Sequence, residues 1–218
     1  MVLIAGGTAA LLLRSHQSPS AFALSTPSPA SSGGGLGGKW VVGTGSEAGY
    51  RVREKFINQP ASTEAVARTT KVSGSLQVRA AGSVLTVTSM DFGADLTQLV
   101  SQDKYATFQA FQRDSFIRSI YLQTDLYPKA EFRADSAQLP GDLTAGPLTL
   151  DVTGRLALHG ETRPATAHVQ VQLNGSSVEV VGSITVDMRD YNISVPDISF
   201  TKAEPTAVIE YHLIFVRA

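Results

Sequence analysis

Apolar and polar residues alternate with a period of two through much of the C-terminal half of the chain. Between Leu148 and Leu158 the apolar side chains occupy even positions, and between Ala165 and Leu173 they occupy odd positions. A tight turn at Gly160-Glu161 would place Leu148 opposite Leu173, with all these apolar side chains on one face. The pattern therefore predicts an antiparallel hairpin that buries one face.

The same alternation predicts further strands around this hairpin. Asn174-Gly175 is a strong hairpin signal, with a loop of either two or four residues. Apolar residues then occupy even positions of Val178–Val186 and odd positions of Val208–Val216. About eight antiparallel strands, each with one apolar face, favour a barrel or a two-sheet sandwich. The earlier strands are expected at Ala48–Arg53, Arg68–Val78, Val84–Met90 and Ala130–Ala134.

Between Asp95 and Pro128 the apolar spacing changes from that of a strand to that of a helix. We expect a short helical insertion at about residues 110–122 in an otherwise all-β domain. The apolar residues with helical spacing are Leu96, Leu99, Val100, Phe116, Ile117, Ile120 and Tyr121.

The first 13 residues form an uncharged, largely apolar run, which Arg14 follows. A helix of this length spans about 20 Å, too short for the roughly 30 Å hydrocarbon core of a bilayer. We therefore expect residues 1–14 to be a signal sequence or a membrane anchor that lacks its first turns. A buried N-terminal helix is the alternative.

The next stretch is dominated by Ser, Gly and Pro, which supply 15 of the 24 residues from 15 to 38. Such a composition buries too little apolar surface to offset the entropy of ordering the chain. We expect residues 15–39 to be a disordered tether and residues 40–218 to form the folded domain. An apolar start followed by a tether predicts an extracytoplasmic domain, membrane-tethered or secreted.

The composition excludes several function classes. The 218 residues include no cysteine, which excludes disulfides, thiolate catalysis and Cys-ligated metal sites. The formal net charge of −1 supplies no basic field, so we expect no nucleic-acid partner. The predicted register separates His159 from His168 by about 20 Å. We therefore expect solvated histidines and no metal site.

No arrangement of residues predicts catalysis. Gly43–Ala48 matches the dinucleotide pattern G-x-G-x-x-A, but the residues after it alternate as a strand, whereas that pattern requires a helix. A glycine-rich turn is the expected structure there. Asp187 and Asp190 could mimic a carboxylate pair, but Arg189 lies between them at a strand end, which favours a solvated turn. We expect no catalytic residue and no cofactor.

Several motifs, in their order and spacing, resemble YceI-like, polyisoprenoid-binding domains over about residues 40–218. The chain departs from the family pattern at Ala67, where glycine is common, and at Tyr191, where tryptophan is common. The matching motifs are Trp40-Val41-Val42, Gly45-Ser46-x-Ala48-Gly49-Tyr50-Arg51-Val52, Ala67-Arg68-Thr69, Val72-Ser73-Gly74, Arg113-Asp114-x-Phe116-Ile117-Arg118, Tyr127-Pro128-x-Ala130-x-Phe132, Gly154-x-Leu156-x-Leu158-His159-Gly160-x-Thr162, Asp190-Tyr191-Asn192-Ile193-x-x-Pro196 and Ile209-Glu210-Tyr211-x-Leu213.

The resemblance implies a lipocalin-like, eight-stranded antiparallel barrel with an elongated apolar interior. It is strongest to exported, membrane-tethered members, and it implies binding of a long isoprenoid chain of the polyprenyl phosphate or quinone type. Arg113 and Arg118 would be about 140° apart on a helix, so only one can face a cavity mouth. We expect Arg118 to bind the headgroup and Arg113 to pair with a neighbouring acid.

These expectations lead to a non-enzymatic carrier that shelters an isoprenoid or similar amphiphilic lipid inside the barrel. The alternatives are a ligand-free structural or interaction module of the cell envelope and, third, an enzyme acting on the lipid. The expected partners are the lipid and a membrane contacted by the N-terminal segment, with a homodimer as an open alternative. The expected ligand-binding residues are Arg118, Arg113, Phe116, Leu150, Val152, Leu156, Val169, Gly182, Ile184, Tyr211 and Leu213.

Overall fold

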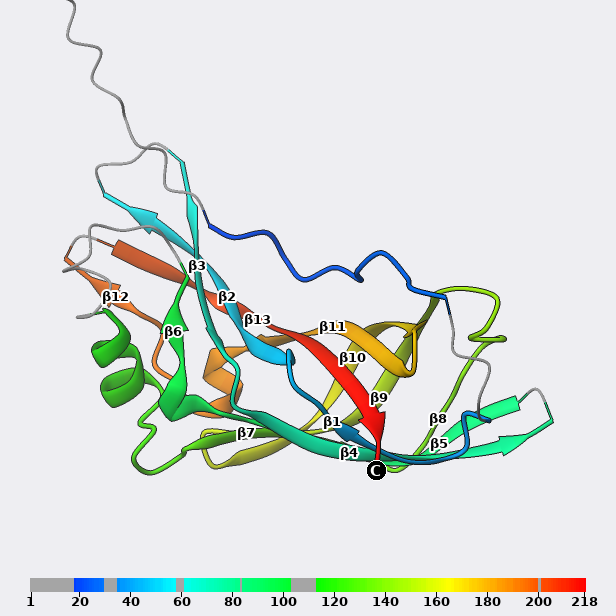
Figure 1. Cartoon of the computed structure of the whole chain (residues 1–218). Coiled ribbons are helices and arrows are strands. Elements are labelled where there is room, and N and C mark those ends of the chain that lie inside the picture. Colours follow the sequence, from blue (N-terminus) through cyan, green and yellow to red (C-terminus); the bar gives the residue numbers. More distant parts are fainter. Residues whose placement is uncertain (1–17, 30–34, 58–60, 83, 103–112, 200) are drawn as a thin grey trace, which may run out of the picture.

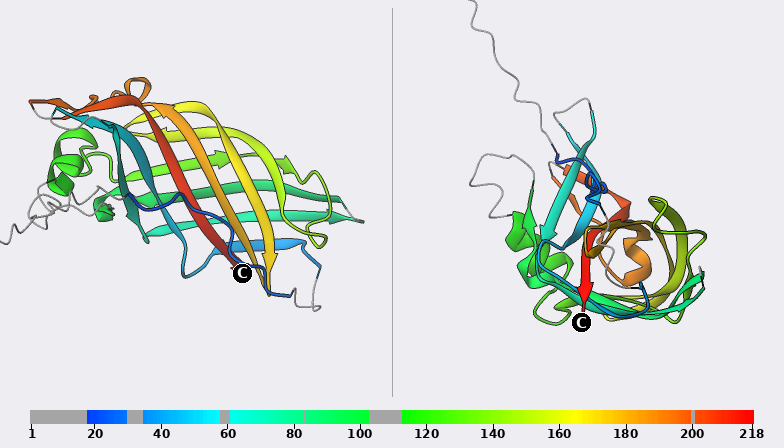
Figure 2. Two further views of the ribbon diagram at one scale, coloured as in Figure 1. Left: turned by 90° about the horizontal axis from the view of Figure 1, so that it is seen from above. Right: turned by 45° about the vertical axis from the view of Figure 1, so that its right-hand side comes forward.

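The computed structural model describes residues 18–29, 35–57, 61–82, 84–102, 113–199 and 201–218. Its strands lie in one antiparallel sheet that closes into an elongated barrel (Figures 1 and 2). In chain order the elements are β1 (Gly38–Val42), β2 (Glu47–Phe56), β3 (Thr63–Thr69), β4 (Val72–Ala81), β5 (Val84–Asp95), η1 (Leu96–Gln98), β6 (Val100–Ser101), η2 (Ile117–Tyr121), β7 (Lys129–Ala134), β8 (Ala137–Gln138), β9 (Leu148–Leu158), β10 (Glu161–Asn174), β11 (Ser177–Asp187), η3 (Met188–Tyr191), β12 (Asp197–Ile198) and β13 (Thr201–Arg217).

Eight strands form the closed ring. Strands β1, β4, β5, β7, β9, β10, β11 and β13 pair in this order, and β1 also pairs with β13. Because β13 is 17 residues long, its first part pairs with β2 and its last part with β1. The glycine-rich residues 43–46 separate β1 from β2, as the sequence predicts. The predicted all-β, eight-stranded antiparallel barrel is confirmed.

The β9–β10 hairpin has the predicted faces but a different register. Its turn is His159-Gly160, both residues have positive φ (50° and 80°), and Leu158 pairs with Glu161. Leu148 therefore lies opposite Val171, whereas the sequence analysis placed it opposite Leu173. The register is wrong by two residues, and because a shift of two preserves the alternation, the apolar side chains still face inward.

The next hairpin resolves the open question of its loop length. Asn174 pairs with Ser177, which leaves the two-residue loop Gly175-Ser176. Gly175 has a φ of +61°, and this left-handed conformation is one that glycine adopts without a steric penalty.

The helical insertion lies at one end of the barrel, where the described residues 113–121 are helical. The remainder of the range predicted to be helical before residue 113 lies outside the described residues. Leu96 belongs to the short helix η1, whereas Val100 lies in the short strand β6. In the described part of the chain, no helix is long and apolar enough to cross a membrane.

An extended segment, residues 18–29, lies along the outside of the barrel and is called the strap below (Figure 1, dark blue). The guanidinium groups of Arg51 and Arg68 donate hydrogen bonds to the carbonyl oxygens of Pro19 and Ser20 at 2.9 and 2.7 Å. The Arg68 guanidinium also lies 3.9 Å from the centre of the Phe22 ring. The sequence analysis expected these residues to belong to a disordered tether, whereas in the structure polar groups on the barrel wall contact them.

The strap also buries Glu179, which projects from the outer face of β11 and is only 2% exposed. Its carboxylate accepts hydrogen bonds from the backbone N and Oγ of Ser25 and from Gln172 Nε2, and His212 Nε2 lies 2.8 Å away. Burial acts to raise the pKa of Glu179, but these hydrogen bonds outweigh it and lower the pKa to about 2.

We expect acidification to weaken the fold through Glu179. Its folded-state pKa of about 2 lies below the ordinary 4.5, so its contribution to stability is present above about pH 4.5 and is lost as the pH falls toward 2. The full contribution is roughly 3 kcal/mol. Denaturant unfolding should show Glu179→Gln less stable than wild type at neutral pH, with a difference that shrinks in acid. A difference independent of pH would contradict this role.

Candidate functional site

The barrel encloses two cavities, one toward each end. The larger has a volume of about 1020 Å³ and the smaller about 100 Å³. On β9, Leu158 lines the large cavity, whereas Leu150 and Val152 line the small one. Of these two cavities among the described residues, the larger is the one with room for a long apolar molecule.

Small side chains create the space of the large cavity. Their positions on the inner face follow from the strand alternation, but alternation alone does not show which inward residues border empty space, so the sequence analysis missed them. The alanines that line the cavity are Ala48, Ala65, Ala94, Ala130, Ala203 and Ala207, from strands β2, β3, β5, β7 and β13.

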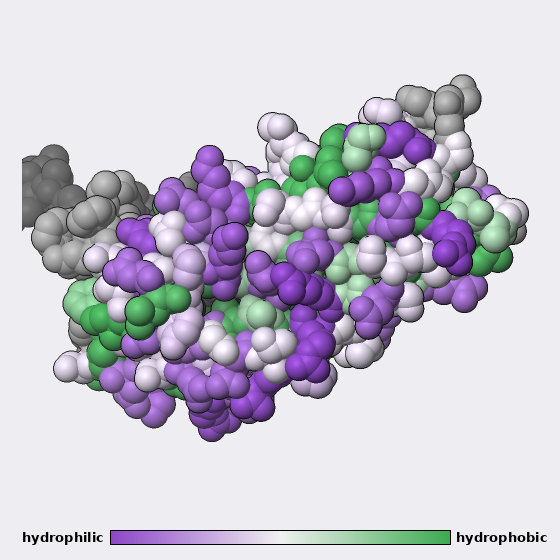
Figure 3. All heavy atoms as spheres, turned by 90° about the horizontal axis from the view of Figure 1, so that it is seen from below, coloured by the Kyte–Doolittle hydropathy of each residue, from purple (hydrophilic) through white to green (hydrophobic). Residues whose placement is uncertain are grey.

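Exposed apolar side chains mark the mouth of the large cavity. Phe116, Ile120 and Ile198 line the cavity and are nevertheless 56%, 51% and 45% exposed. Figure 3 shows a group of apolar residues at this end, beside hydrophilic residues, and further apolar residues elsewhere on the same face. Apolar surface beside a cavity is typical of an entrance for an apolar ligand or of a contact with another apolar surface.

One ion pair lies in the wall near this mouth. Arg113 Nη2 is 3.4 Å from Glu54 Oε1, and both residues line the large cavity. Arg118 lines neither cavity, and its guanidinium donates a 2.7 Å hydrogen bond to the carbonyl oxygen of Leu99. Of the two arginines, Arg113 and not the expected Arg118 faces the large cavity, and the expected acidic partner of Arg113 is present.

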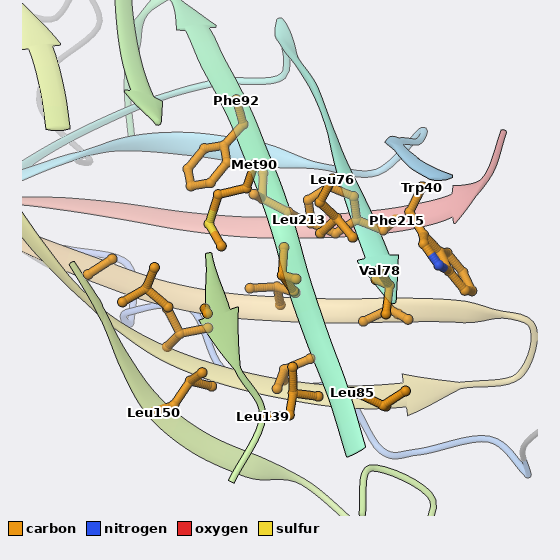
Figure 4. A pocket seen from close by; sticks show the side chains of 18 of the residues that line it. Trp40, Leu76, Val78, Leu85, Met90, Phe92, Leu139, Leu150, Leu213 and Phe215 are labelled. Carbon is orange, nitrogen blue, oxygen red and sulfur yellow. The ribbon is translucent and has the colours of Figure 1, made fainter. Parts of the chain in front are cut away.

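The small cavity is lined by apolar side chains and by Tyr211 (Figure 4). Phe92 and Met90 lie at one end of it, and Trp40 and Phe215 lie at the other. Tyr211 is 3% exposed, and its hydroxyl has no hydrogen-bond partner among the described residues. Burial raises the pKa of this hydroxyl above its ordinary value, so the group stays protonated.

An aromatic layer of Phe92, Phe132 and Tyr211, called the partition below, lies between the two cavities. The ring centres of Phe92 and Phe132 are 5.4 Å apart, and those of Phe92 and Tyr211 are 5.6 Å apart. Strands β5 and β13 are not neighbours in the sheet, so the contact between Phe92 and Tyr211 bridges the lumen.

Two inward glycines make room for the partition. A Cβ atom on Gly182 would lie 2.4 Å from Tyr211 Oη, and one on Gly154 would lie 2.5 Å from Phe132 Cζ. The sequence analysis expected Gly182 to border a ligand, whereas in the structure the Tyr211 ring occupies the space beside it.

The structure therefore distributes the predicted ligand-binding residues over three places. Arg113 and Phe116 line the large cavity. Leu150, Val152, Val169, Tyr211 and Leu213 line the small cavity. Arg118, Leu156, Gly182 and Ile184 line neither cavity, and Leu156 and Ile184 are almost completely buried in the core.

His159 and His212 are less exposed than predicted, whereas His168 is solvent-exposed as predicted. His159 is 9% exposed, its ring packs against Tyr127, and its Nδ1 lies 3.0 Å from the carbonyl oxygen of Tyr191. His168 lies opposite Asp151 on the surface, and its Nδ1 is 2.6 Å from Asp151 Oδ1. Over the described ranges, no three His, Asp or Glu side chains lie close enough together to hold a metal ion.

A closed antiparallel barrel around a large apolar cavity defines the lipocalin-like class of β-barrel proteins. Within this class the chain belongs to the YceI-like domain family, whose model matches residues 41–214. Its sequence is 33% identical over 94 residues to UPF0312 proteins of Pseudomonas putida strains F1 and KT2440, which is 39% of this chain and 45% of theirs. The match thus spans less than half the length of these relatives.

Two solved structures share the fold. A polyisoprenoid binding domain from Saccharophagus degradans, implicated in plant cell wall breakdown, superposes with a TM-score of 0.58 at 15% identity, over 84% of this chain and 99% of that one. BcnA of Burkholderia cenocepacia superposes with a TM-score of 0.52 at 18% identity, over 77% and 95%. At such low identity the likeness shows the fold alone.

Proposed function

We propose that this protein binds an amphiphilic lipid with a long apolar chain, of the isoprenoid type, inside the large cavity, and that it acts as a carrier and not as an enzyme. The observation that carries the proposal is the 1020 Å³ cavity lined mainly by apolar side chains. A barrel filled by its own side chains, as a ligand-free module requires, would leave no such volume. The polyisoprenoid binding domain with the same fold supports an isoprenoid as the apolar chain of the ligand.

Burial of the apolar chain of the lipid supplies the driving force for binding. Each methylene group transferred from water contributes about 0.8 kcal/mol. The headgroup would lie near the mouth, where Arg113 and Glu54 are the facing charges. We further propose that the domain works outside the cytoplasmic membrane, because residues 1–14 resemble a signal or anchor segment.

The experiment that tests this function fills the large cavity. In Ala207→Phe the new ring projects into the space that the chain would occupy, and displacing two methylene groups costs roughly 1.6 kcal/mol, or at least tenfold in affinity. Titration with a prenyl alcohol should show this loss. Thr206→Phe, one position away on the exposed outer face, is the matched control and should bind like wild type. Equal affinity of both variants would contradict binding in this cavity.

The ion pair at the mouth should set the preference between charged and neutral headgroups. Glu54→Gln removes the carboxylate that pairs with Arg113. A prenyl phosphate should then bind about tenfold to a hundredfold more tightly, because a hydrogen bond between Arg113 and a charged group is worth roughly 1.5–3 kcal/mol. Arg113→Gln should weaken the same ligand, while a prenyl alcohol should change little in both variants. Equal effects on phosphate and alcohol would contradict a headgroup contact at Arg113.

A further inference from the structure

The small cavity gives way to the large cavity at one level of the barrel. On each of three strands, an aromatic residue of the partition borders the small cavity, and the residue two positions away lines the large one. The pairs are Phe92 and Ala94 on β5, Phe132 and Ala130 on β7, and Tyr211 and Ile209 on β13. Residues two apart on a strand share a face, so the boundary between the cavities coincides with the partition.

The partition is packed tightly in place. Phe132 and Tyr211 are 2% and 3% exposed, and the rings of Phe92 and Tyr211 meet across the lumen. The glycines beside the two buried rings leave no slack, because a Cβ atom on Gly154 would lie 2.5 Å from Phe132 Cζ and one on Gly182 would lie 2.4 Å from Tyr211 Oη. A chain that enters from the mouth therefore meets packed rings and not an open passage.

We propose that the partition sets the maximum length of the apolar chain that the barrel accepts, with the chain end lying against Tyr211 and Ala48. This inference rests on the proposed function and adds to it a limit on ligand length. Ala48 lines the large cavity and lies directly opposite Tyr211 in the β2–β13 pairing. From Thr201 near the mouth to Tyr211, ten residues of tilted strand give a depth of roughly 25 Å.

The small cavity is also relevant to selectivity for the length of the ligand. It is apolar and lies directly behind the partition, so it would accept the end of a longer chain if the rings were smaller. In the native protein that extra length has to remain outside the barrel, in contact with water. Affinity should consequently rise with each added isoprene unit up to a limit and then stop rising.

Titration of the purified protein with prenyl alcohols of increasing length tests the limit. In Tyr211→Val the two cavities should join, so the limit should move to a longer chain, and the first alcohol beyond the wild-type limit should bind about tenfold more tightly than to wild type. Tyr211→Phe is the matched control, because it keeps the ring and removes only the hydroxyl, and its limit should equal that of wild type. An unchanged limit in Tyr211→Val would overturn the proposal.

A second variant tests the same claim from the other side of the partition. Ala48→Leu adds volume at the deep end of the large cavity, so its limit should move to a shorter chain. This variant decides the question if Tyr211→Val does not fold, and an unchanged limit in it would overturn the proposal. If no prenyl alcohol of any length bound to wild type, the proposed function itself would be contradicted and this inference with it.

Discussion

The variant Gly182→Phe should lose more than about 3 kcal/mol of unfolding free energy instead of simply blocking a cavity. The first side-chain atom alone would lie 2.4 Å from Tyr211 Oη and 2.6 Å from the carbonyl oxygen of His168. The second contact is with backbone, so rotation of a neighbouring side chain cannot relieve it. Overpacking of a well-packed core typically costs about 1–3 kcal/mol, and an entire ring at this position should cost more than that.

Denaturant unfolding measures this loss. Thr185→Phe places the same side chain on the exposed outer face of the same strand and should change stability by only about 0.5 kcal/mol. If Gly182→Phe were as stable as Thr185→Phe and failed only to bind lipid, Gly182 would face a ligand space and the account of the partition would be wrong.

The second large effect is expected at Glu210, on the outer face of β13. This residue is 3% exposed, and its two carboxylate oxygens accept hydrogen bonds from Arg51 and Arg68. Glu210→Gln preserves the shape but removes the charge that offsets two largely buried guanidinium groups. Removing one partner of a buried ion pair costs about 3–5 kcal/mol, and we expect the lower end of this range because the arginine side chains are 12% and 13% exposed.

An exposed pair in the same barrel provides the control. Asp91 accepts from Arg133 at 2.8 Å, but both side chains are more than half exposed. Asp91→Asn should therefore cost no more than about 1 kcal/mol in the same unfolding experiment. Similar losses for Glu210→Gln and Asp91→Asn would show that the charges beneath the strap contribute no more than surface charges.

The strand alternation predicted a barrel or a sandwich together with its inner face, and the resemblance to YceI-like domains favoured the barrel. Leu150, Val152, Tyr211 and Leu213 face the lumen as predicted. The register of β9 and β10 was missed because His159 takes a positive φ, a conformation for which histidine is an unusual residue. The burial of Glu179 and Glu210 was missed because alternation assigns them to the outer face, and only the structure shows the strap that covers part of it.

The binding cavity was harder to predict than the fold. Gly182 suggested space for a ligand, but it accommodates the aromatic ring of Tyr211 from the neighbouring strand. The free volume lies beside alanines such as Ala94, Ala130 and Ala207, whose small size is informative only when the side chains across the lumen are known. The maximum length of the ligand's apolar chain likewise depends on contacts between strands that are distant in the sequence.

The most direct test of the central claim is native mass spectrometry of the protein purified gently from its own host. We expect a mass increment for one bound amphiphile with a long apolar chain, and we expect Ala207→Phe to lose this increment while Thr206→Phe retains it. Wild-type protein that is empty after gentle purification and also fails to take up added prenyl alcohols would contradict a lipid-binding role for the large cavity.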